Sequence, residues 1–212
     1  MTQVSLWTFN ETAPTAGDPL VDSANADGAQ NGVYAGDATA VGGAGQFDGV
    51  GDYAEIAASS AFQLATGTLV TEFTPDSLHE GTLFARDSAG NDDGGHFDLR
   101  ILADGSIAVR AQTDTTDYNY TTAAGFYAAG DDIRVTFSWN DDGSGGEYKV
   151  ENLTQATSYS TPTDGAITWD MGASFNEPIT IGAGQTASGD NVADNLDSFF
   201  DGSVAYVSIF DE

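Results

Sequence analysis

Basic and aromatic side chains that could bind an acidic or hydroxyl-rich ligand gather between residues 86 and 120. The segment 96–112, HFDLRILADGSIAVRAQ, holds one histidine and two arginines, and the tetrapeptide DYNY follows at 117–120. Guanidinium groups bind carboxylate or sulfate through two parallel hydrogen bonds, and a tyrosine ring can stack on a sugar ring. We therefore expect a glycan, anionic or rich in hydroxyl groups, to bind at Arg86, His96, Arg100, Arg110, Tyr118 and Tyr120.

The same side chains allow two other interpretations. In a jelly-roll polysaccharide lyase, an arginine neutralises the uronate carboxylate while a histidine and a tyrosine move protons, as His96 with Tyr118 or Tyr120 could. The R-x-E-x-R and Q-I-H strands of such lyases are missing from the sequence, as is the E-x-D-x-x-E strand of sandwich glucanases. Two carboxylates could still meet in space for glycoside hydrolysis. In the purely structural interpretation, Arg110 pairs with Asp98 across strands and both tyrosines are half-buried.

Oxygen ligands suited to a calcium ion occur near both ends of the chain. Asp22, Asn25 and Asp27 lie in one glycine-containing loop, and Asp201 would lie near it if the terminal strands pair. Carboxylate and amide oxygens are the ligands that Ca²⁺ prefers. The loop departs from the D-x-[DN]-x-[DN]-G pattern at Ala24, and NADG also fits an ordinary turn. We therefore expect calcium at these four residues, with a simple turn as the alternative.

One predicted hairpin determines which of these side chains share a face. A three-residue loop at 103–105 places every apolar side chain of segment 96–112 on one face, whereas a two-residue loop mixes the faces. The predicted pairs are therefore Ile101 with Ile107, Leu99 with Val109, and Phe97 with Ala111. The opposite face then carries His96, Asp98, Arg100, Arg110 and Gln112, and Arg86 from the preceding strand could join them.

Alternating apolar and polar residues dominate the rest of the chain. In DIRVTFSW, Ile133, Val135, Phe137 and Trp139 fall on one side. Such runs recur every 10 to 15 residues or so and are separated by turn sequences such as NDDGSGG and GAGQTA. The pattern predicts an all-β, antiparallel sandwich that forms a single domain over residues 1–212.

The composition limits the possible partners. The chain has 212 residues, no cysteine and a formal net charge of −28, from 33 acidic and 5 basic side chains. Such a field repels nucleic acids and anionic membrane surfaces, and the lack of cysteine excludes thiolate chemistry. No apolar run is long enough to span a bilayer, and residues 1–30 show neither the basic n-region nor the apolar h-region of a secretory signal peptide. We expect neither nucleic-acid binding nor membrane insertion.

Several segments, in order along the chain, resemble the concanavalin A-like lectin/glucanase superfamily, and in particular its bacterial laminin-G-like jelly-roll modules. VSLWTFNE is similar to the family's first strand, GQFDGVGDYAEI to its FDG..DYVEI strand, and FDGSVAYVSIF to its last strand. Four further segments lie between the second and the last of these, in the family's order: TGTLVTEFTP, FDLRILADGSIAVR, DDIRVTFSWND and EPITIGAG. The resemblance therefore spans residues 1–212. Ala205 and Tyr206 stand where the family's closing strand carries two acidic residues.

This resemblance implies a concanavalin A-like jelly roll that binds glycans or proteins, in the family often with a calcium ion at the rim. We therefore expect a non-catalytic carbohydrate-binding or adhesive module of an extracellular bacterial protein, secreted or at the cell surface. A lyase or hydrolase acting on a uronate polysaccharide is the alternative. The resemblance also explains the repeated FDG, at 47–49 and 200–202, as a mark of the fold.

Overall fold

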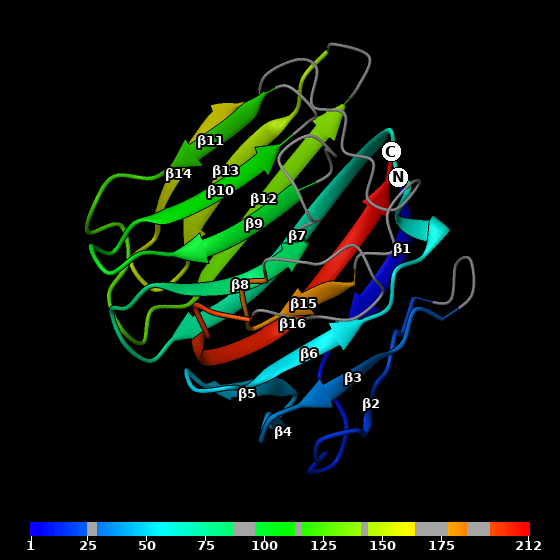
Figure 1. The fold of residues 1–212 in the computed structure, drawn as a ribbon. Coiled ribbons are helices and arrows are strands. Elements are labelled where there is room, and N and C mark those ends of the chain that lie inside the picture. Colours follow the sequence, from blue (N-terminus) through cyan, green and yellow to red (C-terminus); the bar gives the residue numbers. More distant parts are fainter. Residues whose placement is uncertain (25–28, 87–95, 113–115, 141–143, 164–177, 186–195) are drawn as a thin grey trace.

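The chain folds into two antiparallel β-sheets packed face to face (Figure 1). The computed structural model describes residues 1–24, 29–86, 96–112, 116–140, 144–163, 178–185 and 196–212. Within these ranges, the only helical element is a short 3₁₀ turn at Ser60–Phe62. The predicted all-β sandwich of the jelly-roll type is confirmed.

The first sheet follows the strand order β14-β13-β12-β7-β16-β5-β4. Strand β5 pairs with the first part of β16, and β1 pairs with its last part. The long central strands of this sheet are β7 and β16. Both ends of the chain lie in this sheet, because the N-terminal strand β1 pairs with the C-terminal strand β16. The bounds are β1 Thr2–Trp7, β4 Thr39–Val41, β5 Ala44–Asp48, β7 Thr66–Pro75, β12 Ile133–Asn140, β13 Glu147–Asn152, β14 Thr157–Pro162 and β16 Asp201–Asp211.

The second sheet follows the order β11-β10-β9-β8-β15-β6-β3-β2. Its strands β8, β9 and β10 lie side by side, as Figure 1 shows, and carry most of the basic residues of the chain. The bounds are β2 Pro19–Leu20, β3 Gly32–Ala35, β6 Tyr53–Ile56, β8 Gly81–Arg86, β9 His96–Ile101, β10 Ile107–Gln112, β11 Asp117–Thr121 and β15 Ile179–Ile181.

Strand alternation builds the core between the sheets. The side chains predicted to share the inner face of β12, Ile133, Val135, Phe137 and Trp139, are all buried. Facing them from the second sheet are inner residues such as Phe97, whose ring centre lies 5.3 Å from that of Phe137. Burying aromatic and branched side chains from both layers is the main term that stabilises such a sandwich.

The predicted hairpin register is confirmed. Ile107 lies opposite Ile101, Val109 opposite Leu99 and Ala111 opposite Phe97. Gly105 occupies the left-handed region with φ of 80°, which glycine adopts without steric cost, so the three-residue loop can close. Because the register is fixed, Arg110 lies opposite Asp98 on the outer face, as expected.

The two FDG segments contact each other. Asp201 pairs with Asp48 and Gly202 with Phe47 where β16 meets β5, and the rings of Phe47 and Phe200 have centres 6.3 Å apart. The chain ends also meet, because β1 pairs with the second half of β16 (Figure 1). A search of the described residues for a helix capable of spanning a membrane finds none.

Candidate functional site: a polar pocket on the outer sheet

A polar pocket of about 240 Å³ lies on the face of the second sheet that points away from the core. Strands β8, β9 and β10 form its floor, and residues after β15 and before β16 complete its wall. Alternation along β9 explains the polarity, because Phe97 and Leu99 point into the core and their neighbours point out. Its charged and amide side chains include Arg86, His96, Asp98, Arg100, Arg110 and Gln185.

Four of the expected site residues therefore line one pocket, but to different degrees. Arg100 and Arg110 are partly exposed, with side-chain exposures of 36% and 28%. Arg86 and His96 are only 1% and 4% exposed. The register of Arg86 pairs it with Phe97, a core residue. Two guanidinium groups are thus within reach of a ligand, and His96 belongs to the wall of the pocket. The expectation that Arg86 joins the outer face is wrong, because its register with Phe97 places it on the inner side of the sheet, where it only borders the pocket.

The carboxylate of Asp98 lies within this basic group. Its Oδ1 is 3.3 Å from Arg100 Nε, in an ion pair along one strand. Arg110 turns instead to Asp117, at 3.1 Å, and donates a hydrogen bond to Gln112 Oε1 at 2.9 Å. Burial raises the pKa of Asp98, and the charges of Arg100 and then Arg110 oppose that rise. The structural interpretation of Arg110 thus needs a correction, because its ion pair is with Asp117 and not with Asp98.

Gln185 is a pocket residue that the sequence analysis missed. It is 4% exposed, and its Nε2 donates to the carbonyls of Pro178 at 2.7 Å and Ala85 at 3.3 Å. Its Oε1 has no hydrogen-bond partner within the described residues. Gln185 lies in GAGQTA, which the sequence presents as a turn, so only the pairing of β15 with β8 brings it to the pocket.

Tyr118 and Tyr120 lie on the other face of the sheet, and their expected place beside the arginines is wrong. Tyr120 pairs with Val109 and Tyr118 with Ala111, both inward-facing residues. Tyr120 is 8% exposed and its ring centre lies 5.9 Å from that of Phe137. The two tyrosines alternate with Asn119, and the register of β11 places their rings against the core.

The carboxylate of Asp22 is already surrounded by backbone donors. Its Oδ1 accepts hydrogen bonds from the N–H groups of Leu6 and Ala24 at 2.9 and 3.0 Å, and its Oδ2 accepts from Gln30 N–H at 2.9 Å. With an exposed fraction of 1%, Asp22 organises the loop that follows β2. The other two expected ligands of this loop, Asn25 and Asp27, lie outside the described residues.

Asp201 does not join Asp22, so the expectation that the two share a site is wrong. Asp22 forms an isolated β-bridge with Trp7, and Trp7 pairs with Val207 of β16. Asp201 is the first residue of β16, six residues before Val207. At the rise of an extended strand this separates them by about 20 Å. The termini do pair, but β1 covers only the second half of β16, and Asp201 accepts a hydrogen bond from Ser77 Oγ at 2.6 Å.

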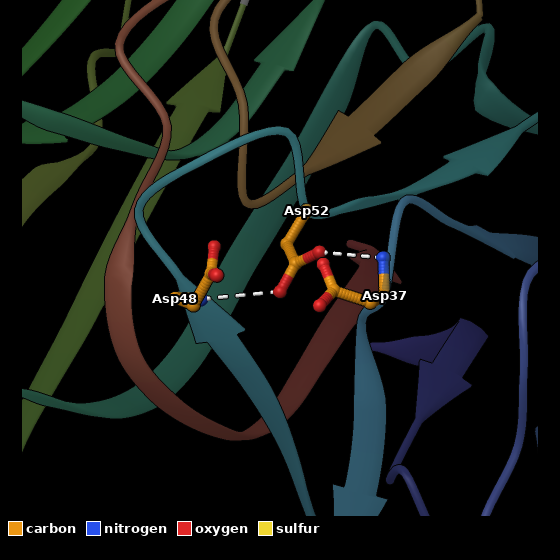
Figure 2. A group of neighbouring side chains, drawn as sticks. All are labelled: Asp37, Asp48 and Asp52. Atoms are coloured by element: carbon orange, nitrogen blue, oxygen red, sulfur yellow. Dashed lines mark hydrogen bonds between the residues drawn. The ribbon is translucent and has the colours of Figure 1, made fainter.

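A different group of carboxylates comes together at the β5–β6 loop (Figure 2). One oxygen each of Asp37, Asp48 and Asp52 lies within 4.8 Å of the others. Asp52 is 3% exposed and accepts hydrogen bonds from the N–H groups of Asp37 at 2.7 Å and Asp48 at 3.2 Å. Burial, and then the neighbouring Asp37 side chain, raise the pKa of Asp52 to about 6. Oxygen ligands in this arrangement have the chemistry of a hard-cation site.

Comparisons with known proteins show the fold of this chain but no family. No family model and no curated protein matches the sequence. Among solved structures, the binding domain of botulinum neurotoxin DC in complex with SialylT is similar, with a TM-score of 0.60 and 10% identity over 99% of this chain and 48% of that one. The K499G mutant of the NanB sialidase from Streptococcus pneumoniae gives a TM-score of 0.56 and 18% identity over 81% of this chain and 26% of that one.

A third similar structure is the enzymatically active domain of bacteriophage CBA120 tailspike protein 2. Its TM-score is 0.53, with 15% identity over 97% of this chain and 30% of that one. The chain thus spans about a quarter to a half of the length of these three structures. At these identities the likeness establishes a shared β-sandwich fold, and function has to be argued from the site itself.

Proposed function

We propose that this protein is a non-catalytic glycan-binding module and that the pocket on β8, β9 and β10 is its binding site. The observation that carries the proposal is the set of partly exposed Arg100 and Arg110 around a recessed Asp98. Such a set offers hydrogen-bond donors and acceptors at fixed positions in a concave site, which is what recognition of a sugar requires.

The distribution of charge supports this choice of site. Arg86, Arg100 and Arg110 are three of the five basic residues of a chain with a net charge of −28, and all three line the pocket. Concentrating cations at one place on a highly acidic surface creates a local potential that differs from the rest of the molecule. The similar neurotoxin domain, solved with SialylT, is an example of a related sandwich that holds a glycan.

The finer parts of the proposal follow the sequence resemblance. We place the chain among the laminin-G-like modules of the concanavalin A-like superfamily, as one domain over residues 1–212 of an extracellular bacterial protein. Secretion or display at the cell surface would bring such a module to its glycan. Calcium dependence stays a prediction.

The test removes both accessible guanidinium groups. The double variant Arg100→Ala/Arg110→Ala should lose binding on a glycan array and in calorimetry with the glycan that the array identifies. Arg134→Ala/Lys149→Ala is the matched control, because it also removes two cations but from the outer face of the other sheet. Binding that survives in the first variant, with an unchanged circular dichroism spectrum, would refute the proposal.

Catalysis is the second candidate function, and the raised pKa of Asp98 favours it. Glu80 and Asp197 also line the pocket, and a carboxyl group with a raised pKa beside a second carboxylate is the apparatus of glycoside hydrolysis. The lyase mechanism is less well supported, because no tyrosine is among the described residues that line the pocket. Incubation with uronate polysaccharides, followed by absorbance at 235 nm and by reducing-end assay, distinguishes an enzyme from a binding module.

A further inference from the structure

Three polar atoms of the pocket point to the kind of ligand it takes. Within the described residues, Asp98 Oδ1, Arg100 Nε and Gln185 Oε1 make no hydrogen bond, although each is buried from solvent. Asp98 and Arg100 attract each other across 3.3 Å but are not aligned as donor and acceptor. Buried polar atoms are nearly always paired, because leaving one without a partner destabilises the protein. A bound ligand with matching groups would supply the missing partners.

From these atoms we propose that the pocket recognises a neutral sugar through neighbouring hydroxyl groups, with Asp98 and Gln185 accepting from the sugar and Arg100 donating to it. The inference rests on the proposed glycan-binding function and adds the chemical class of the sugar. It also assigns specificity to Asp98 and Gln185, neither of which is among the binding residues expected from the sequence.

The balance of donors and acceptors favours hydroxyl groups over a carboxylate or a sulfate. Two of the three unpaired atoms are acceptors, and one is a donor. A carboxylate or sulfate only accepts hydrogen bonds, so it would satisfy Arg100 and leave Asp98 and Gln185 without a donor. A hydroxyl group both donates and accepts, so two adjacent hydroxyls can satisfy all three atoms.

The charged side chains of the pocket also favour a neutral sugar over an anionic one. Asp98 is joined in the lining by Glu80 and Asp197, so three acidic side chains accompany the three arginines. Arg110 is already paired with Asp117, and Arg86 is buried in the wall. An anionic sugar would thus gain little net attraction here, while the net charge of −28 on the whole molecule would repel it.

The experiment compares matched sugars on the intact protein. A glycan array carrying hexose oligosaccharides and their hexuronic-acid counterparts should give signal on hexose members and little on the acidic ones. Asp98→Asn removes the charge with almost no change of shape. It should weaken hexose binding roughly 10- to 100-fold, the effect of losing a hydrogen bond to a charged acceptor, and should improve binding of the acidic counterparts.

Glu151→Gln is the control, because it removes one carboxylate from the opposite sheet and should leave both affinities unchanged. A wild-type preference for hexuronic acids would overturn this inference and leave the proposed function standing. Hexose binding that is unchanged in Asp98→Asn would overturn the role of Asp98. No binding to any glycan would overturn the inference and the proposed function together.

Discussion

Asp98 lies directly opposite Arg110 on the neighbouring strand, yet its ion pair is with Arg100 on its own strand. The guanidinium of Arg110 instead forms an ion pair with Asp117 on β11 and donates a hydrogen bond to Gln112. The register of β9 against β10 thus brings Asp98, Arg100 and Arg110 together. The position of Asp117 on β11 determines which of the two arginines pairs with Asp98. The two arginines accordingly have different effects on Asp98.

We expect Arg100→Ala to destabilise the protein more than Arg110→Ala. The first variant leaves a recessed carboxylate without its nearest cation, whereas the second breaks a pair whose Asp117 side chain is 47% exposed and which is worth about 0–1 kcal/mol. The difference, about 1–3 kcal/mol for a buried group left without its partner, should shrink as the pH is lowered, because a protonated Asp98 needs no cation. Urea unfolding of both variants at several pH values measures it. Equal losses at every pH would contradict the assignment.

Tyr118 provides a test of the strand register at the pocket. Because its side chain lies on the core side of β11, Tyr118→Leu should leave glycan affinity within about twofold of wild type and lower stability by about 1 kcal/mol. Arg110→Ala, on the opposite face at a neighbouring position, is the comparison and should weaken binding. A tenfold loss of affinity in Tyr118→Leu, with the protein still folded, would restore a stacking role for this ring.

Local alternation in the sequence was sufficient to predict the layers and one register. The inner face of β12 and the pairing of β9 with β10 follow from period-2 patterns and a single short loop. That pairing placed His96, Asp98, Arg100 and Arg110 on one side of the sheet, which is the framework of the pocket. Predictions of this kind succeed because a slip of one residue would expose a whole apolar face.

Features that depend on distant pairings were not predictable in this way. DYNY fixes that Tyr118 and Tyr120 share a face, but which face depends on the register of β11 against β10. Gln185 reaches the pocket only through the pairing of β15 with β8, about 100 residues earlier in the chain. The group of Asp37, Asp48 and Asp52 likewise depends on how the β3–β4 and β5–β6 connections meet.

The contact between the two FDG segments should be important for stability. Phe200 is fully buried, and its ring centre lies 5.9 Å from that of Phe73 and 6.3 Å from that of Phe47. Phe200→Ala leaves a cavity between the sheets and should cost about 3–5 kcal/mol of unfolding free energy in urea titrations. Val50→Ala, in the nearby loop and 75% exposed, is the control and should cost less than about 0.5 kcal/mol. A loss below about 1 kcal/mol for Phe200→Ala would show that this contact is dispensable.

The pKa of Asp52 predicts a pH dependence of stability. In the folded protein this pKa is raised from 3.8 to about 6, so between these values the folded state binds more protons than the unfolded state. The contribution of Asp52 to stability is therefore greatest at the acidic end of this window and falls as the pH rises through about 6. Asp52→Asn should remove this part of the slope, whereas Asp76→Asn, at an exposed position, should keep it. Urea unfolding between pH 4 and pH 7, about the window of this pKa, measures both; identical slopes in the two variants would contradict the assignment.

Calcium binding can be tested for its location as well as for its presence. A bound ion that the unfolded chain lacks raises stability by RT ln(1 + [Ca²⁺]/Kd), about 2.7 kcal/mol at a hundredfold excess over Kd. We therefore expect EDTA to lower the melting temperature and added Ca²⁺ to restore it.

The variants Asp22→Asn and Asp37→Asn distinguish two candidate sites for the calcium ion. The carboxylate oxygens of Asp22 already accept three backbone hydrogen bonds, whereas Asp37 lies in the group with Asp48 and Asp52. A calcium response lost only in Asp37→Asn would place the ion at that group, and one lost only in Asp22→Asn would return it to the loop after β2. No response to EDTA in the wild-type protein would remove calcium from its chemistry.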